Sequence, residues 1–472
     1  MKNTTDKLSG LISGLAPAEL PLFRSMLENG KNDSDKKLLR LFNGLVDDVR
    51  SEEHFPDHNE TFRKVFWHER YDDQKFRYLK TDLVAKLESF IARRGFEKDE
   101  QLYARVLMRE LASRRSVKSY NSIRLTHEEK SKAPKWKDIS FYQHQYESDL
   151  IHLAKATDEM KRGGKSNIGE VVEHLDKFYL ARKLQLCCEI FNVRNVVSVE
   201  HKVFLLEEIL AHLKNKSYAD VSVIAIYYRI LMTLLHSEKT EHFHQLRELL
   251  EKNEKDFSLT ELREMYQYVM NYCIKKINLG HIEWTKTLFE IYKTTINNKV
   301  LMSEGHLPHL DFKNIVTIGL RLKEFDWVKK FIEENKKFIR AAERQNAYIY
   351  NSANLAFNTG DHSRCMKLLQ QVEFSDLYYQ LDSKSILLKT YFELEETEPF
   401  FYHASAFRIF LKRNKLVSEY QRTIYLNLIR YSSQLLRAQG NKKRIAVIRK
   451  KVEENRNIAD LNWLLSKFAS HS

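Results

Sequence analysis

Few residues in this chain have the types and spacing that catalysis requires. The segment Gly163-Gly164-Lys165-Ser166 ends like a phosphate-binding loop, but that motif needs a glycine five residues before Gly164, where Glu159 stands. The preceding residues 150–160 also have the apolar spacing of a helix, whereas the motif follows a strand. We therefore expect a turn between helices here and no nucleotide site.

Histidines that could hold a metal occur in close pairs without a third ligand at a recognisable spacing: His54 and His58, His242 and His244, His306 and His309. Pro56 interrupts the helix that would align the first pair. The segment 127–131 begins like a zinc-protease helix, but Ser131 stands where the second histidine is required. No Gly-x-Ser-x-Gly nucleophile elbow occurs either. We expect a protein that is not an enzyme and that binds no metal or cofactor.

The four cysteines contain no Cys-x-x-Cys pair: Cys187, Cys188, Cys273 and Cys365. Cys187 and Cys188 would point about 100° apart on a helix, so we expect buried free thiols in a reducing compartment. The first residues lack an apolar leader segment. The most apolar stretch, 221–235, has only 15 residues and contains Arg229, which indicates a core helix rather than a membrane span. We expect a cytoplasmic protein.

Composition favours an all-α fold. The 472 residues include only 13 glycines and 6 prolines, the residues on which sheets and irregular loops depend. Hydrophobic residues make up 43% of the chain, which is too much for a disordered protein. Helical patterns of about 12 to 22 residues follow one another with short breaks, as in antiparallel helices stacked in series.

Part of this pattern repeats. Four stretches read as a helix, a polar turn and a second helix: 268–292, 312–338, 348–372 and 386–410. Their turns, at Gly280, Lys323, Gly360 and Glu395, lie 43, 37 and 35 residues apart. Such spacings are typical of helical-repeat proteins, in which each hairpin buries its apolar face against the next.

The clearest copy has small residues at Ala353 and Cys365 around the turn Gly360-Asp361, followed by Leu369. This arrangement resembles the tetratricopeptide repeat, although the first-helix tryptophan and the terminal proline of that repeat are missing. Four further segments are similar to tetratricopeptide-like helical-repeat proteins of Bacteroidota: 314–316, 325–327, 387–394 and 407–415. The resemblance implies an α-solenoid preceded by an N-terminal helical module in a bacterial cytoplasm. It implies no activity.

We therefore predict three parts: an N-terminal helical module (1–112), a basic connector (113–137) and a tetratricopeptide-like α-solenoid (138–472). Solenoids commonly bind a protein or peptide along the first helices of their hairpins. The predicted partner-binding residues on those helices are Asn314, Arg321, Asn351, Asn354, Lys384 and Lys389. The function that we expect is a scaffold or adaptor for a partner protein.

Charge distribution leaves a second possibility open. The chain has a net charge of +14, of which residues 408–456 contribute +11; residues 105–137 add +7, and the rest is mildly acidic. The predicted basic patch consists of Arg408, Lys412, Arg413, Lys415, Arg422, Lys442, Lys443, Arg444, Lys450 and Lys451. With Tyr420, Tyr425 and Tyr431 it could bind nucleic acid, aided by the N-terminal module as a variant helix-turn-helix. We favour an acidic protein partner and predict no membrane binding; the sequence fixes no oligomeric state.

Overall fold

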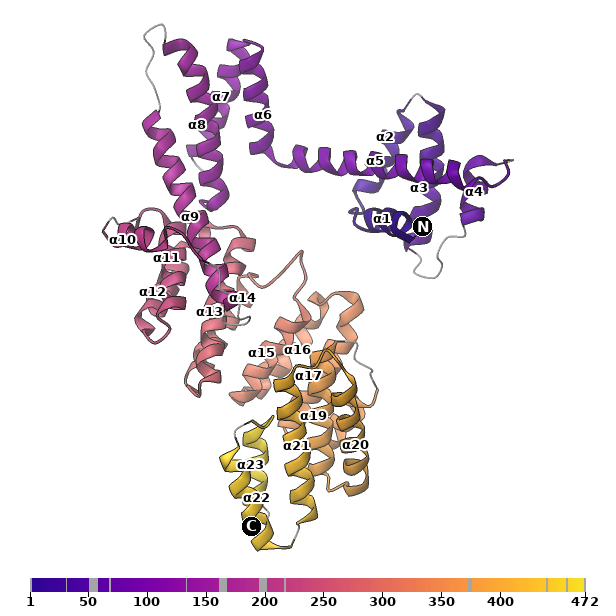
Figure 1. Cartoon of the computed structure of the whole chain (residues 1–472), viewed down its shortest axis with the longest axis vertical. Helices are drawn as coiled ribbons and strands as arrows, with labels where there is room; N and C mark the ends of the chain where they lie inside the picture. Colours follow the sequence, from indigo (N-terminus) through magenta and orange to yellow (C-terminus); the bar gives the residue numbers. More distant parts are fainter. Residues whose placement is uncertain are drawn as a thin grey trace. The chain divides into compact units, whose positions relative to one another are not determined.

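A computed structural model describes residues 2–30, 32–50, 58–67, 69–132, 134–160, 168–194, 202–215, 218–371, 376–438, 440–455 and 457–470. Within these ranges the chain is all-α, as predicted, and contains no strand (Figure 1). No helix of the described ranges has the length and apolar character needed to cross a bilayer. The segments 163–166 and 54–57, discussed above, lie outside the description.

The chain divides into two compact units. The first comprises 1–135 and 139–178, and the second comprises 136–138 and 179–472. The helices of the first unit are α1 (Lys2–Ser13), α2 (Glu19–Glu28), α3 (Asp33–Arg50), α4 (His58–Phe66), α5 (Asp73–Lys98), α6 (Glu100–Ser113), α7 (Val117–Lys132) and α8 (Ile139–Met160). Helix α9 (Ile168–Arg194) contributes residues to both units.

Helices α1 to α5 enclose the main core of the first unit. Its centre is aromatic: the ring of Phe23 lies 4.8 Å from that of Phe42 and 5.2 Å from that of Phe90, edge to face. The side chain of Asp99 accepts a hydrogen bond from the backbone N–H of Leu102 and thereby caps α6 directly after α5 ends. The first unit thus passes from this core into α6 without a long loop.

Most of the segment predicted as a basic connector is the helix α7. Its apolar periodicity is hard to see in the sequence because the buried face combines Tyr120 and Ile123 with a histidine, His127, which is 7% exposed. Tyr120 packs with Met108 and Ile151 in a small core between α6, α7 and α8. Most of the segment predicted as a connector is therefore a helix that packs in a core. The predicted limits of the three parts stay predictions.

The second unit contains the remaining helices in chain order. They are α10 (Leu206–Asn215), α11 (Ser222–Leu235), α12 (Thr240–Asn253), α13 (Leu259–Asn278), α14 (Trp284–Asn297), α15 (His309–Arg321), α16 (Phe325–Asn335), α17 (Ala341–Asn358), α18 (His362–Leu369), α19 (Leu377–Glu393), α20 (Thr397–Arg413), α21 (Glu419–Arg437), α22 (Lys442–Glu454) and α23 (Leu461–Ser470). Two short 3-10 turns, Glu254–Asp256 and Lys336–Phe338, follow α12 and α16.

Two kinds of packing recur in this unit. Each helix from α13 to α23 packs against the next one along the chain, and α15, α17, α19, α21 and α23 also pack in succession against one another. Figure 1 shows α17, α19 and α21 side by side. The apolar stretch 221–235 forms the buried helix α11, and all four cysteines are buried and unpaired.

The four turns singled out in the sequence share one backbone geometry. Gly280, Lys323, Gly360 and Glu395 all have a left-handed φ, between 57° and 98°. In each turn the next residue donates its backbone N–H to a carbonyl five residues earlier, as His281 does to Lys276 and Asp361 does to Ala356. This is the Schellman closure, which satisfies carbonyl groups that the helix end leaves open.

Alanine substitutions should distinguish the left-handed glycines of the turns, Gly280 and Gly360, from Gly95 inside α5. A Cβ at Gly280 or Gly360 would meet open space, so only backbone strain opposes it. We expect Gly280→Ala and Gly360→Ala each to lower the free energy of unfolding by about 1 kcal/mol. Gly95→Ala within α5, where a Cβ also meets open space, should raise it by about 1 kcal/mol. Urea unfolding of the four proteins measures this; a loss of stability in all three variants would contradict the interpretation.

Candidate binding surfaces of the second unit

The predicted partner-binding residues divide into exposed and buried positions. Asn314 and Arg321 on α15 are exposed. Asn354 on α17 is half-buried, and its Oδ1 accepts a hydrogen bond from the Nδ2 of Asn358. Lys384 on α19 is half-buried, with its Nζ 5.0 Å from the centre of the Phe410 ring. These four side chains remain accessible to a partner.

Asn351 and Lys389 lie inside the packed helices instead. Asn351 is fully buried, and its Nδ2 donates to the carbonyl of Ala347 at 2.7 Å. The reason is that α17 packs against both α15 and α19, which cover this face of the helix. Lys389 is 6% exposed, and its Nζ pairs with Asp460 Oδ2 at 2.7 Å. Neither side chain is on a surface that a partner could touch.

Lys389 belongs to a polar stripe along α19. The stripe is Asp382, Ser385, Lys389 and Glu393, spaced so that all four lie on one face of the helix. Tyr425 of α21 donates to Asp382 at 2.8 Å, and Ser385 donates to Asp460 at 3.1 Å. Two residues of α23 contact the last carboxylate: the indole N–H of Trp463 donates to Glu393 at 2.6 Å, and Lys467 pairs with it. The stripe thus joins α19 to α21 and α23.

Breaking the Lys389–Asp460 pair should show what the stripe contributes. Asp460→Asn removes the charge that Lys389 needs, and asparagine tolerates the left-handed φ of 51° at this position. Because Asp460 remains partly in contact with water, we expect a loss of about 2 kcal/mol rather than the full value for a buried pair. Adding Lys389→Met should recover most of the loss in urea unfolding. If the effects of the two substitutions simply add, the pair is not coupled.

The predicted basic patch consists of two groups on different helices. The first group, Arg408, Lys412, Arg413 and Lys415, lies at the end of α20 and in the turn after it. The second group lies on α22: Lys442, Lys443, Arg444, Lys450 and Lys451. Helix α21 separates them in the chain and packs against both α20 and α22.

Arg422, the remaining member of the predicted patch, is committed to local structure. Its Nε donates to the carbonyl of Leu411 at 3.0 Å, and one terminal nitrogen donates to the carbonyl of Val417. The other terminal nitrogen pairs with Glu419 at 3.0 Å. Arg422 therefore holds the turn between α20 and α21 and is half-buried.

The three tyrosines near the basic residues also differ in exposure. Tyr425 and Tyr431 are 9% and 5% exposed, and they belong to the core of the C-terminal helices. Burial first, and the neighbouring carboxylate of Asp382 next, raise the pKa of the Tyr425 hydroxyl. Tyr420, by contrast, is 66% exposed at the start of α21. Only this one of the three tyrosines is available for stacking on a base.

One face of α20 exposes large apolar side chains among the basic ones. Tyr402 and Ile409 are two turns apart on α20, 82% and 50% exposed, and Leu416 in the next turn is 79% exposed. We call the following set the α20 surface: Tyr402, Ile409, Lys412, Arg413, Lys415, Leu416 and Tyr420. The exposed basic face of α22 holds a single large apolar side chain, Val447.

A titratable cluster lies elsewhere in the second unit, and no sequence motif indicated it. Tyr227 of α11 donates to Glu261 of α13 at 3.4 Å, and Gln185 of α9 contacts Tyr227 and Glu264 at 3.2 Å each. Burial, followed by repulsion from Asp138 and Glu264, raises the pKa of Glu261 from 4.5 to about 8. In the sequence Glu261 looks like an ordinary acid at a helix start, since it follows the capping residue Ser258.

The raised pKa predicts a specific dependence of stability on pH. Between pH 4.5 and 8 the folded chain holds a proton on Glu261 that the unfolded chain has lost. The stability contributed by this group is therefore complete below pH 4.5 and is lost as pH rises towards 8, by up to about 1.4 kcal/mol per pH unit. Glu261→Gln should abolish this decline in urea unfolding at pH 5, 6, 7 and 8. Parallel curves for wild type and variant would contradict it.

Comparison of the chain with protein-family models, with curated proteins and with solved structures returned no match in any of the three.

Proposed function

We propose that this protein is a non-catalytic cytoplasmic adaptor that holds an acidic segment of a partner protein on the α20 surface. We further propose that the second unit is an α-solenoid of tetratricopeptide-like hairpins. The observation on which the function rests is the mixture of exposed apolar and basic side chains at the end of α20. The residues Asn314, Arg321, Asn354 and Lys384 offer a further contact surface on the first helices.

Recurrence of one packing unit supports the solenoid. Schellman turns close α13, α15, α17 and α19, the first helices of four hairpins. Of these, α15, α17 and α19 pack in series, and α21 continues the series. A repeat that buries its apolar face only against its neighbours leaves the outer face of each second helix free. Helix α20 is such a second helix, between α19 and α21 in the series.

The chemistry of the α20 surface favours a protein over a nucleic acid. Protein interfaces centre on exposed aromatic and aliphatic groups surrounded by polar ones, whereas nucleic-acid interfaces are more polar throughout. Ile409 and Leu416 have no counterpart to contact on a phosphate backbone. Lys412, Arg413 and Lys415 complement an acidic partner and would speed its association. An amphipathic helix with acidic and apolar residues on adjacent faces satisfies both requirements.

The α22 group gives the nucleic-acid alternative its best support. Five lysines and arginines there accompany one exposed aliphatic residue and no exposed tyrosine. Such a surface can attract phosphate by counterion release but lacks stacking groups. The protein-partner proposal and the nucleic-acid alternative therefore predict different effects when the basic residues of α20 or of α22 are replaced.

Charge reversal on the two helices provides matched variants. One carries Lys412→Glu, Arg413→Glu and Lys415→Glu; the other carries Lys442→Glu, Lys443→Glu and Arg444→Glu, with the same change in net charge. The probe is a fluorescent amphipathic peptide of about 20 residues, with glutamate and leucine on adjacent helical faces, titrated with the full chain. We expect the α20 variant to bind it at least about tenfold more weakly, and the α22 variant to bind it within about threefold of wild type.

Two controls make the result decisive. The double variant Ile409→Ser, Leu416→Ser keeps the charge and should also weaken binding of the peptide. A purely electrostatic site would not show this loss. A single-stranded oligonucleotide of similar length should fail to displace the peptide. Equal losses in both charge-reversal variants, or displacement by the oligonucleotide, would overturn the proposal in favour of non-specific charge attraction or nucleic-acid binding.

The same variants can be tested by capture from a lysate treated with nuclease. We expect partner proteins that resist the nuclease and that are lost only with the α20 variant.

A further inference from the structure

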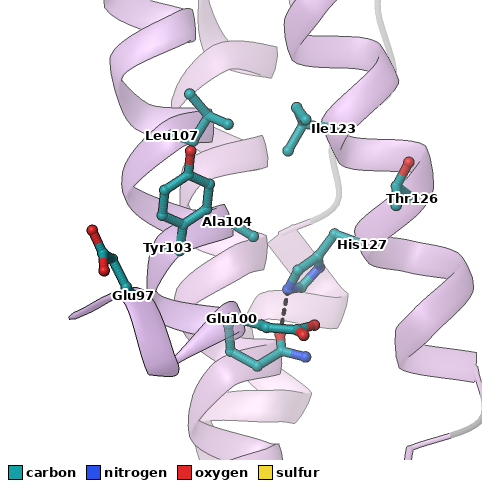
Figure 2. A pocket seen from close by; sticks show the side chains of 9 residues that line it. Glu97, Glu100, Tyr103, Ala104, Leu107, Ile123, Thr126 and His127 are labelled. Carbon is teal, nitrogen blue, oxygen red and sulfur yellow. Dashed lines mark hydrogen bonds between the residues drawn. The ribbon is translucent and has the colours of Figure 1, made fainter. Parts of the chain in front are cut away.

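A hollow of about 320 Å³ opens between α6 and α7 in the first unit, where the end of α5 adjoins them (Figure 2). Figure 2 shows Ala104 and Leu107 on α6 facing Ile123 and His127 on α7. Its volume is at the small end of the range of small-molecule sites. It can therefore accommodate a molecule with a single ring or a short chain.

The walls of the hollow are mainly apolar. Ala104, Leu107 and Ile123 are half-buried, and the ring of Tyr103 adds a fourth apolar wall at the more exposed side. The surface of these side chains in contact with solvent would be removed from water by an apolar ligand of matching size. Removing this surface from water favours binding in proportion to its area. Shape and polarity thus favour a ligand that is apolar over most of its surface.

One polar pair faces this apolar lining. His127 Nε2 lies 2.7 Å from Gln101 Oε1, and both residues line the hollow. Burial, and then repulsion by His152, Arg105 and His144, lower the pKa of His127 and so favour the neutral form of the ring. Because the amide oxygen of Gln101 accepts from the ring, its amide nitrogen keeps N–H groups that can donate to a ligand, as the hydroxyl of Tyr103 at the more exposed side also can. The lining therefore selects for an acceptor oxygen on an otherwise apolar molecule.

The residues that line the hollow disfavour an anionic ligand. Glu97 and Glu100 line it, and among its nine described lining residues there is no lysine or arginine. Arg93 and Arg94 are nearby in the chain but donate to the carboxylate of Glu97. A ligand carboxylate would lose hydration in this mainly apolar hollow without a lysine or arginine among the described lining residues to pair with, which costs binding energy.

We propose that this hollow binds a small uncharged molecule that is apolar except for one carbonyl or hydroxyl oxygen. The apolar part lies between Leu107 and Ile123, and the oxygen accepts a hydrogen bond from the amide of Gln101. This site is independent of the α20 surface and would give the adaptor a small-molecule input in its first unit.

Three aromatic probes of nearly equal size test the proposal with the full chain: benzamide, its anionic isostere benzoate, and ethylbenzene, which has no acceptor. Saturation-transfer NMR and the shift of the His127 imidazole signals report binding. We expect benzamide to bind at least about tenfold more tightly than benzoate and measurably more tightly than ethylbenzene. Equal binding of benzoate, or no signal from benzamide at millimolar concentration, would overturn the proposal.

Variants then locate the site. Gln101→Leu should remove the preference for benzamide over ethylbenzene, while Leu107→Trp fills the hollow and should abolish binding of both. Leu125→Ala changes an exposed leucine of α7 that does not line the hollow, and it should leave binding unchanged. Helix content from circular dichroism confirms that each variant is folded. Benzamide binding that survives in the folded Leu107→Trp variant would refute this location.

Discussion

The second unit depends on one constraint: the chain must reverse its direction between consecutive packed helices. Because the chain has so few glycines and prolines, many of its turns must use residues for which a left-handed backbone conformation is unfavourable. In the turns after α13, α15, α17 and α19 the structure meets this need with one left-handed residue and one Schellman closure each, even where the residue is Lys323 or Glu395. A left-handed conformation costs a non-glycine residue about 1–2 kcal/mol. Packing of the two helices that the turn brings together must offset that cost, so turn and core stabilise each other.

The polar stripe on α19 follows from the same series of helices. Because each first helix is covered on two sides by its neighbours, polar residues on those sides must find partners inside the stack. Asp382, Lys389 and Glu393 do so with α21, Asp460 and α23. These contacts pair one cation and two carboxylates of α19 inside the packed helices, so the three charges are not offered to a partner. The accessible surface that remains is the outer face of the second helices, together with Asn314, Arg321, Asn354 and Lys384 on the first helices.

The sequence predicted the all-α class and the positions of the turns because both depend on local patterns. Gly280 and Gly360 punctuate two apolar runs, and the left-handed residues lie where the polar breaks occur. Burial across the stack has no such local signal. Asn351 and Lys389 look like surface residues in the sequence and become buried only because α17 and α19 acquire neighbours on both sides. Glu261 could not be recognised either, since its pKa is raised first by burial and then by Asp138, which is 123 residues away in the chain.

The basic patch shows how burial changes a functional interpretation without changing any charge. In the sequence, the alternation of lysine, arginine and tyrosine over 408–456 suits nucleic acid as well as protein. In the structure, Tyr425 and Tyr431 are in the core and Arg422 caps a turn, so the aromatic part of that pattern is largely removed from the surface. Ile409 and Leu416 are exposed instead. Since aliphatic groups gain little from a phosphate backbone and much from an apolar helix face, exposure of these two residues weighs towards a protein partner.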